Sequence, residues 1–219
     1  MSAAVLVMAK APRPGNAKTR LEPLLGRRGA AALQAVLIRS TLDWAQASVA
    51  GSVFLAYAPP GAARQMAAIA PGAALFPQRD GDLGARLRAA MARSFGAGTD
   101  SLLIVGTDTP TLEPRHAVAA LELLDQGCDV CFGPAADGGY YLAALAHPAP
   151  AAFDIPAEAW GGREVLRLSI EAAERAGLRV GVLDELERDI DTPADAAAAL
   201  ADPRTPAWVA AALGAEIIR

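Results

Sequence analysis

Short apolar runs alternate with longer amphipathic segments along most of the chain. The runs are rich in aliphatic and β-branched residues and too short for core helices, so each predicts a buried strand. They cover residues 5–8, 53–57, 75–76, 102–105, 128–132 and 178–183. Apolar residues at helical spacing predict the helices between them: 27–48, a short alanine-rich helix ending at 71, 86–95, 114–126, 163–176 and two terminal helices.

This alternation predicts an α/β fold with a mostly parallel central sheet and helices on both faces. The proline-rich residues 142–162 predict irregular structure. Neither an internal repeat nor a linker divides the chain, so residues 1–219 are expected to form one domain. Because parallel strands end at the same edge of a sheet, the loops after residues 8, 76, 105, 132 and 183 should meet on one rim, where open α/β sheets bind ligands.

Composition and charge narrow the classes of partner. The 219 residues are 53% hydrophobic but only 5% aromatic, which favours closely packed helices over a β-sandwich. The net charge of −4 argues against a nucleic-acid surface, which needs a basic face. No leader pattern or run of about 20 apolar residues is present, so we expect a cytoplasmic protein without a membrane partner. The oligomeric state is left open, a homodimer included.

The two cysteines, Cys128 and Cys131, have the spacing of a redox pair or half a zinc site. They fall in a predicted strand, where residues three apart face opposite sides. Neither of the two histidines lies at metal-ligand spacing from them. Buried core cysteines are therefore the favoured interpretation.

Four cationic residues follow the first predicted strand: Lys10, Arg13, Lys18 and Arg20. The intervening prolines and glycine prevent regular structure, so the strand should deliver these cations in a loop at the rim. Such a loop suits an anion, most often phosphate, although a solvated basic loop is the alternative. The string is no P-loop, because Ala17 stands where that motif needs glycine before the lysine.

Two aspartates at predicted strand ends are candidate metal ligands. Asp108 follows the most apolar strand, and a carboxylate near phosphates suits Mg²⁺ or Mn²⁺. Asp191 is the natural second ligand. The alternatives are structural: Asp108 could close a turn, and the string around Asp191 reads as a helix start with Thr192 as the N-cap.

The string Asp137-Gly138-Gly139-Tyr140 is a further candidate. Its glycines allow a ligand close to the backbone, and Asp137 could orient an acceptor hydroxyl or act as a base. A tight turn between two strands is the structural alternative. Gln78 and Asp82 have groups suited to a base or sugar, although an ordinary exposed loop explains them as well.

Five strings in this order resemble the nucleotide-diphospho-sugar transferase (GT-A) superfamily, specifically its bacterial radical-SAM/selenodomain-associated transferase family. They begin at Pro12 (PxPGxxKTRL), Gln78 (QxxxDLGxR), Gly106 (GTDTP), Gly133 (GPxxDGGY) and Asp189 (DxDTPxD). The resemblance covers nearly the whole chain. It implies a Rossmann-like GT-A fold that binds a nucleotide and a divalent metal at the carboxyl rim.

The resemblance also implies roles for individual residues. Phosphate and nucleotide binding falls to the first two strings, with Lys18 and Arg20 as the catalytic cations: Pro14, Gly15, Lys18, Thr19, Arg20, Gln78, Asp82 and Gly84. Asp108 and Asp191 would hold the metal. The acceptor would face Asp137, Gly138, Gly139, Tyr140 and Trp160. One position departs from the family, because Gly162 follows Trp160 where a threonine is usual, and a hydroxyl is missing there.

Three function classes remain, and nucleotidyl transfer is preferred. The cations of the first loop suit a leaving pyrophosphate, with a phosphorylated or anionic acceptor that needs no strong base. Glycosyl transfer from a nucleotide sugar to a hydroxyl is the alternative, with Asp137 as the base. A non-catalytic nucleotide-binding module is the third class, and the presence of both Asp108 and Asp191 argues against it.

Overall fold

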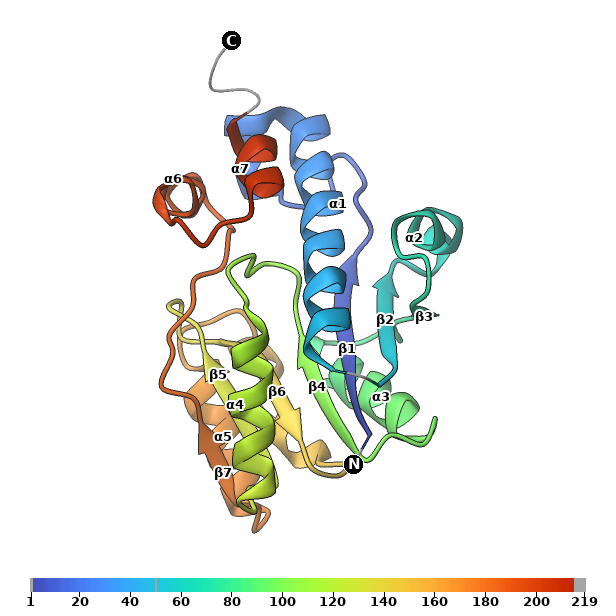
Figure 1. The fold of residues 1–219 in the computed structure, drawn as a ribbon, viewed down its shortest axis with the longest axis vertical. Coiled ribbons are helices and arrows are strands. Elements are labelled where there is room, and N and C mark those ends of the chain that lie inside the picture. The colour runs from blue at the N-terminus through green and yellow to red at the C-terminus, as the bar shows by residue number, and fades with distance from the viewer. Residues whose placement is uncertain (1, 50, 215–219) are drawn as a thin grey trace.

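A computed structural model describes residues 2–49 and 51–214, which form a sheet of seven strands between two layers of helices (Figure 1). The strands are β1 (Ala3–Lys10), β2 (Val53–Ala58), β3 (Ala74–Pro77), β4 (Ser101–Val105), β5 (Val130–Pro134), β6 (Tyr140–Leu145) and β7 (Val180–Val182). Their order across the sheet is β3-β2-β1-β4-β6-β5-β7.

Every strand except β6 runs in the same direction. β6 pairs antiparallel with β4 on one side and with β5 on the other. It is joined to β5 by a short turn, so the two strands form a hairpin within an otherwise parallel sheet. The carboxyl ends of the six parallel strands therefore share one edge, as the sequence predicted, and the turn between β5 and β6 lies at that edge too.

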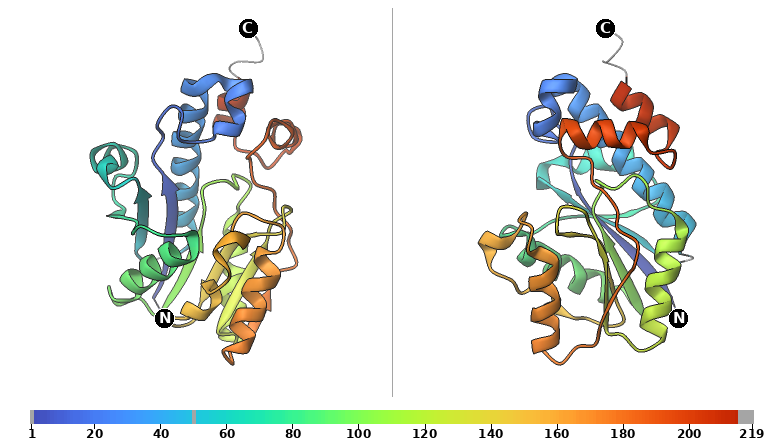
Figure 2. Two further views of the ribbon diagram at one scale, coloured as in Figure 1. Left: turned by 180° about the vertical axis from the view of Figure 1, so that it is seen from behind. Right: turned by 90° about the vertical axis from the view of Figure 1, so that its left-hand side faces the viewer.

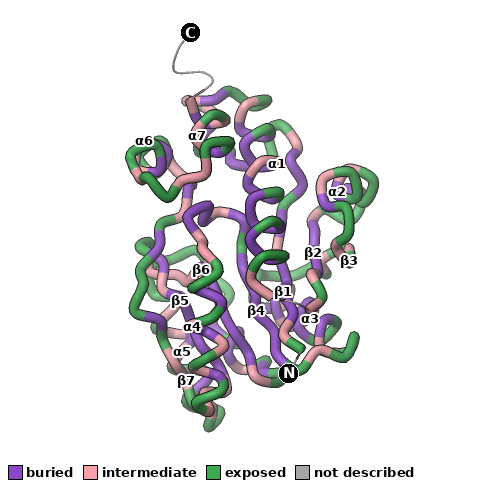
Figure 3. The backbone as a smooth tube through the Cα atoms, in the orientation of Figure 1, coloured by how far each residue is buried: buried purple, intermediate pink, exposed green. Residues whose placement is uncertain are grey.

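The helices divide between the two faces of the sheet (Figure 2). One face packs against α1 (Glu22–Ser48), α2 (Ala63–Ile69) and α4 (Pro114–Asp125). The other packs against α3 (Leu83–Phe95), α5 (Val165–Arg175) and the short 3₁₀ helix η3 (Pro150–Phe153). Because both faces are covered, the central strands are buried along their length (Figure 3). Each large apolar side chain removed from water contributes roughly 1.5–3 kcal/mol.

A separate apolar cluster lies beyond the carboxyl edge of the sheet. The last two helices, α6 (Pro193–Ala201) and α7 (Ala207–Gly214), meet the amino-terminal part of α1 there (Figure 1). Val209 and Leu213 of α7 are fully buried against Leu25, Leu33 and other residues of α1. The two last helices are thus packed next to the loop that follows β1.

The structure confirms the α/β class and most predicted elements, with two differences. β6 was missed, because its apolar run follows two glycines and precedes a proline-rich region that predicts irregular structure. β5 begins at Val130, so Cys128 precedes the strand and only Cys131 lies within it. The assigned α1 starts at Glu22, but Gly26 has non-helical backbone angles, so the continuous helix begins at residue 27, as predicted.

None of the helices in the described residues is both long and apolar enough to cross a bilayer. The remaining 3₁₀ helices are η1 (Thr19–Leu21), η2 (Pro60–Ala62) and η4 (Ala157–Ala159).

Candidate active site

Lys18 is the centre of the candidate site. Its side chain is only 3% exposed, and its ammonium lies 2.8 Å from Oδ1 of Asp108. The same ammonium donates a hydrogen bond to the backbone carbonyl of Ile190, whose N–H in turn donates to the carbonyl of Asp108 over 2.8 Å. Three loops that are remote in sequence are therefore tied together by one buried cation. The structure brings Lys18 and Asp108 together, as expected for neighbours on one rim.

The backbone at Lys18 is in the left-handed conformation, with φ 52° and ψ 41°. Among the described residues it is the only non-glycine with positive φ. This conformation costs an ordinary residue about 1–2 kcal/mol, and such strain concentrates at functional positions. The strained backbone turns the Lys18 side chain inward, whereas Arg20, two residues further along, stays exposed.

A chain of buried polar groups orients Asp108. The Gln34 side-chain amide of α1 donates to the Thr107 hydroxyl over 3.0 Å, and that hydroxyl donates to Oδ1 of Asp108 over 3.1 Å. Gln34 and Thr107 are both buried. Because a buried donor without a partner is costly, this relay holds the Asp108 carboxylate in one orientation. Gln34 and Thr107 were not identified as site residues from the sequence.

Asp189 is a second carboxylate close to Asp108. It accepts a hydrogen bond from the Thr109 hydroxyl and lines the cavity described below. Burial, together with the negative charges of Asp108 and Asp137, raises the pKa of the Asp189 carboxyl to about 6, although Thr109 and Lys18 oppose the shift. The sequence motif contained Asp189, but only Asp191 was assigned to the metal.

Arg20 and Asp191 form an ion pair on the outer side of this group, with 2.6 Å between Nη1 and Oδ2. Both side chains are about half exposed or more. The next residue, Thr192, caps α6 and forms a reciprocal capping box with Asp195. The prediction that this string starts a helix is thus correct for Thr192 and Asp195. The Asp191 carboxylate takes no part in the cap and pairs with Arg20.

Asp137 lies in the turn of the β5–β6 hairpin. Its Oδ1 accepts a hydrogen bond from the Gly139 N–H over 2.8 Å. Gly138 has φ 92°, and a Cβ there would lie 2.1 Å from the carbonyl oxygen of Arg163. Its own carbonyl accepts from the Leu166 N–H over 3.0 Å. Glycine is therefore required for the turn to lie against the start of α5. The string forms the tight turn between two strands that was the structural alternative, and this turn also lies at the carboxyl edge of the sheet.

A cavity of about 200 Å³ opens beside these carboxylates. Its walls come from β1, α3, β4, the β5–β6 turn, β6 and the segment before α5: Met8, Leu83, Leu87, Ile104, Val105, Gly106, Asp137, Gly139, Tyr140, Tyr141, Trp160, Gly161, Gly162, Val165 and Asp189. The lining is largely apolar. Its charged members among the described residues are the two carboxylates, and no cationic side chain contributes to it.

The Trp160 indole N–H of this wall is buried without a hydrogen-bond partner in the described structure, whereas the buried Tyr140 hydroxyl lies next to the Ser169 hydroxyl. Buried donors are normally paired, so the Trp160 N–H is available to a ligand. Gly84 permits the wall to close, because a Cβ there would lie 2.6 Å from the Phe153 carbonyl and 3.1 Å from the Trp160 ring. Gly162, where the family usually has threonine, contributes only backbone to the cavity.

The other predicted nucleotide-binding residues have structural contacts of their own. The Gln78 amide donates to the carbonyls of Ala9 and Ala56, which joins β1 and β2 at the rim. Asp82 is the N-cap of α3 and accepts from the Ala85 N–H over 2.7 Å. Pro14, Gly15 and Thr19 are exposed in the first loop. Their binding roles stay predictions.

Lys10, Arg13 and the two cysteines do not belong to the candidate site. The Arg13 guanidinium donates to the Gly61 carbonyl over 2.9 Å, and Lys10 is exposed. Cys128 and Cys131 are free thiols, and burial raises the pKa of Cys131 to about 12.

Solved structures with this fold indicate the class of the protein. A protein from Desulfovibrio desulfuricans G20, provisionally named a nucleotide-diphospho-sugar transferase, is 28% identical; the match covers 100% of this chain and 96% of that one, with a TM-score of 0.85. The 4-diphosphocytidyl-2C-methyl-D-erythritol synthase of Anaerococcus prevotii DSM 20548 is 10% identical over 89% and 92% of the two chains, with a TM-score of 0.60.

Molybdopterin-guanine dinucleotide biosynthesis protein A of Archaeoglobus fulgidus is 20% identical over 89% and 94% of the two chains, with a TM-score of 0.53. At these lower identities the likeness concerns the fold. Together, the fold and these relatives define the class, a transferase of the nucleotide-diphospho-sugar transferase type, which confirms the resemblance drawn from the motifs.

The family itself follows from residues 41–159. They match a family described as an uncharacterized protein conserved in bacteria (DUF2064), and the chain belongs to this family. No curated protein matches the chain.

Proposed function

We propose that this protein transfers a sugar from a nucleotide-diphosphate sugar to a hydroxyl group of a small, uncharged acceptor, with the help of a divalent cation. The observation that carries this proposal is the lining of the cavity, in which apolar side chains and the carboxylates of Asp137 and Asp189 surround a space that Lys18 and Asp108 do not themselves line. The relative from Desulfovibrio, by its provisional name, acts in the same class.

The donor would bind by its phosphates at the loop after β1. Lys18 supplies a buried positive charge and Arg20 an exposed one, and each is now paired with a carboxylate. Phosphate oxygens can replace those carboxylates as partners of the cations, because charge-assisted hydrogen bonds to phosphate are strong. Pro14, Gly15 and Thr19 would contribute the exposed backbone of the loop, and Gln78, Asp82 and Gly84 would border the nucleotide.

The same carboxylates fit a hard divalent cation, Mg²⁺ or Mn²⁺. Burial is the main cause that raises the pKa of Asp189, and the nearby negative charges of Asp108 and Asp137 add to the shift. Asp108 and Asp191 are the proposed ligands, with Asp189 beside them. When bound, the cation would neutralise the donor phosphates and the leaving diphosphate.

The acceptor would occupy the cavity. An anionic acceptor would meet the carboxylates of Asp137 and Asp189, whose charge no cationic side chain of the described lining offsets, while the proposed metal ligands Asp108 and Asp191 lie outside that lining; electrostatic repulsion would therefore oppose its binding. A neutral hydroxyl compound meets no such repulsion. The Trp160 indole N–H could donate to one of its oxygens. Asp137 could accept the proton of the attacking hydroxyl, which typically contributes a factor of about 10²–10⁴ in rate.

Nucleotidyl transfer is the second candidate, and the cations of the first loop favour it. They would equally stabilise a leaving pyrophosphate, and two of the neighbours with this fold carry the names of enzymes of nucleotide transfer. The sequence-based preference for nucleotidyl transfer assumed a phosphorylated or anionic acceptor. The cavity, with its two carboxylates, disfavours such an acceptor, and for this reason glycosyl transfer is ranked first.

The products distinguish these classes. The protein is incubated with nucleoside triphosphates or nucleotide sugars, Mg²⁺ or Mn²⁺, and panels of neutral and phosphorylated small acceptors. We expect a nucleoside diphosphate to be released with a nucleotide sugar and a neutral acceptor. Pyrophosphate release with an anionic acceptor would establish nucleotidyl transfer instead. If nucleotides bind tightly but neither a nucleoside diphosphate nor pyrophosphate is released with any acceptor of the panel, the protein is a non-catalytic nucleotide-binding module.

A matched pair of variants tests the assignment of Asp137. Asp137→Asn should lower kcat about 10²–10⁴-fold and leave the affinity for the donor unchanged, because the base acts on the acceptor alone. Asp184→Asn is the control, an exposed aspartate that does not line the cavity. Equal kcat values for Asp137→Asn and the wild type would exclude Asp137 as the base.

A further inference from the structure

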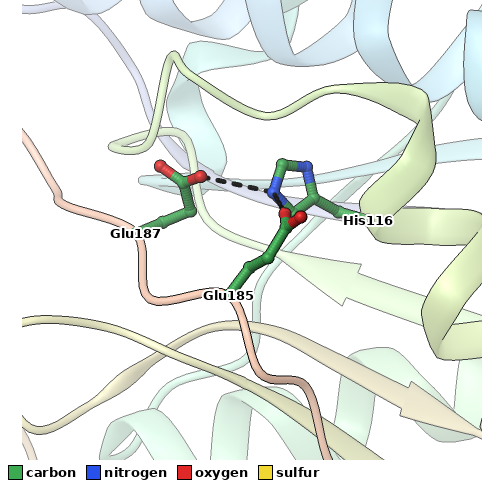
Figure 4. A group of neighbouring side chains, drawn as sticks. All are labelled: His116, Glu185 and Glu187. Carbon is green, nitrogen blue, oxygen red and sulfur yellow. Dashed lines mark ion pairs between the residues drawn. The ribbon is translucent and has the colours of Figure 1, made fainter. Parts of the chain in front are cut away.

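A second group of ligand-type side chains lies outside the proposed active site (Figure 4). His116 belongs to the first turn of α4, and Glu185 and Glu187 come from the segment between β7 and α6. One ligand atom from each lies within 4.8 Å of the other two, the only such triad among the described residues. His116 and Glu187 are 1% exposed, and Glu185 is about half exposed.

The two nitrogens of His116 have different surroundings. The Glu113 backbone N–H donates to Nδ1 over 2.9 Å in the capping box of α4, and the Glu113 carbonyl oxygen lies 3.0 Å from the same nitrogen. Nε2 lies 2.6 Å from Oε2 of Glu185 and 3.3 Å from Oε1 of Glu187. Nε2 is buried and neither contact is aligned as a hydrogen bond, but against the opposing effect of burial the two carboxylates raise the pKa of His116.

This geometry suits a metal ion. A ring N–H needs its acceptor along the N–H direction, whereas a chelated ion takes that position and the other ligands flank it. Metal–nitrogen and metal–oxygen bonds of about 2.0–2.2 Å separate neighbouring ligand atoms by roughly 3 Å. The observed distances of 2.6 and 3.3 Å lie on either side of that value. Metal binding through Nε2 requires the tautomer with its proton on Nδ1, in which Nδ1–H donates to the Glu113 carbonyl instead of accepting from the Glu113 N–H.

The ligands are also supported from outside, as metal ligands usually are. Thr111 donates to Oε2 of Glu187 over 2.5 Å, and Arg204 forms an ion pair with its Oε1. Arg115 lies 3.2 Å from Glu185. These contacts fix both carboxylates in the absence of an ion.

The charges of the cluster leave room for a dication. Arg115 also pairs with Glu113, and Arg204 also pairs with Asp202. Four carboxylates therefore share two guanidinium groups, and two negative charges stay uncompensated when His116 is neutral. Only Glu187 among these carboxylates is fully buried, so its charge has the most to gain from a bound cation.

We propose that His116, Glu185 and Glu187 bind a divalent first-row transition metal, Zn²⁺ above all, at a site separate from the one proposed at Asp108. One imidazole nitrogen and two carboxylate oxygens suit Zn²⁺ better than Mg²⁺, which prefers oxygen alone. The exposed side of Glu185 leaves an entry path and coordination positions for water.

The role of this ion would be structural. The backbone N–H of Glu187 donates to the Pro134 carbonyl, and its own carbonyl accepts from the Ala136 N–H, so Glu187 braces the end of β5. The same segment continues to Asp189. An ion on His116 would therefore fasten the carboxylate segment of the proposed active site to α4.

The test is Zn²⁺ binding to the full chain in excess Mg²⁺, which occupies the hard-cation site, measured by calorimetry and by the rise in Tm. We expect the wild type to bind Zn²⁺ and both His116→Gln and Glu185→Gln to bind it at least about tenfold more weakly. The partly exposed position of Glu185 provides a variant that preserves the buried packing if His116→Gln fails to fold.

Two controls locate the site. His147→Gln removes the other histidine of the chain, which lies on the surface beside Asp129, and should bind Zn²⁺ as the wild type does. Asp108→Asn should also keep its Zn²⁺ affinity. The proposal is overturned if the wild type binds no Zn²⁺ in excess Mg²⁺, if the His116 and Glu185 variants bind as tightly as His147→Gln, or if Asp108→Asn loses Zn²⁺ to the same extent.

Discussion

At the scale of single residues, the candidate site is a set of charges held in place by hydrogen bonds from outside it. Lys18 is buried, and its own backbone has the strained left-handed conformation. Gln34 orients Asp108 through Thr107. The Thr109 hydroxyl donates a hydrogen bond to Asp189. Thr107 and Thr109 belong to the GTDTP string but received no role of their own, and Gln34 was not identified, because a lone Gln in a helix has no distinctive spacing.

Lys18 allows a direct test of phosphate binding. Lys18→Met should lower the affinity for a nucleoside diphosphate about 10–100-fold and leave that for the bare nucleoside nearly unchanged, because a buried charge paired with phosphate contributes about 1.5–3 kcal/mol. Lys10→Met is the matched control on the exposed start of the same loop. Titrations with both ligands provide the measurement, and an equal loss for diphosphate and nucleoside would mean that Lys18 is structural.

Asp189 gives a pH-dependent prediction. Its pKa is raised to about 6 by burial and by neighbouring carboxylates, so the native state holds this proton more tightly than the unfolded chain does. Stability is therefore lost as the pH rises through about 4 to 6. Asp189→Asn removes that loss and should be more stable than the wild type at pH 7.5, by about 1–3 kcal/mol.

Urea unfolding in the absence of metal measures the difference in the free energy of unfolding between Asp189→Asn and the wild type. This difference should be smaller at pH 4.5 than at pH 7.5. A variant that is less stable than the wild type at pH 7.5 would contradict the pKa assignment. Thr109→Val is the companion variant: it removes the hydrogen bond that stabilises the carboxylate and should steepen the loss of stability.

At the scale of elements, the sequence predicts the parallel strands and their covering helices well, since continuous apolar runs and helical spacing are strong signals. The strand β6 is the exception. Its sequence, YYLAAL, has no polar alternation because both faces are buried, and the preceding glycines suggest a loop. The position of Asp137 in a hairpin turn within the sheet depends on that strand, so the wall of the cavity could not be derived from the motif alone.

Gly138 tests how the hairpin turn is seated. Gly138→Ala should lower the free energy of unfolding by about 2–4 kcal/mol, because positive φ is strained and the Cβ would lie 2.1 Å from the Arg163 carbonyl. Gly177→Ala is the matched control: it has φ 80° and no atom within 4 Å of the added Cβ. It should cost only about 1–2 kcal/mol, the backbone strain alone.

Chemical unfolding of the two variants isolates the steric part of the cost. Equal destabilisation would mean that the turn and the start of α5 separate freely. Because Asp137 precedes Gly138, turnover should fall in Gly138→Ala and stay normal in Gly177→Ala.

At the scale of the whole molecule, two arrangements depend on contacts that no sequence pattern indicates. They are the cluster of His116, Glu185 and Glu187 and the packing around the loop that follows β1. His116 and Glu185 are 69 positions apart, and only the packing of the segment after β7 against α4 brings them together. Likewise, α7 was predicted as a terminal helix, but its apolar face reveals nothing of its partner. In the structure that partner is the beginning of α1, directly after the cationic loop.

The packing of α7 gives a prediction at this scale. Leu213→Ala should lower the stability by about 2–5 kcal/mol, because Leu213 is fully buried against α1. It should also weaken nucleotide binding, since the same cluster contains Leu21 of the phosphate loop. Leu200→Ala, at a position 39% exposed in α6, is the control and should change stability by less than about 0.5 kcal/mol. Unchanged nucleotide affinity in a folded Leu213→Ala protein would separate α7 from the site.

The hydrogen bond from Lys18 to Ile190 joins residues 172 positions apart. During synthesis at about 5–20 residues per second, the lysine therefore waits roughly 10–30 seconds for its partner, and the carboxylates at 189 and 191 arrive with it. A nascent chain shorter than this has strands and covering helices but an incomplete charge arrangement. The proposed nucleotide site would therefore be completed late, only after the ribosome has released the segment that follows β7.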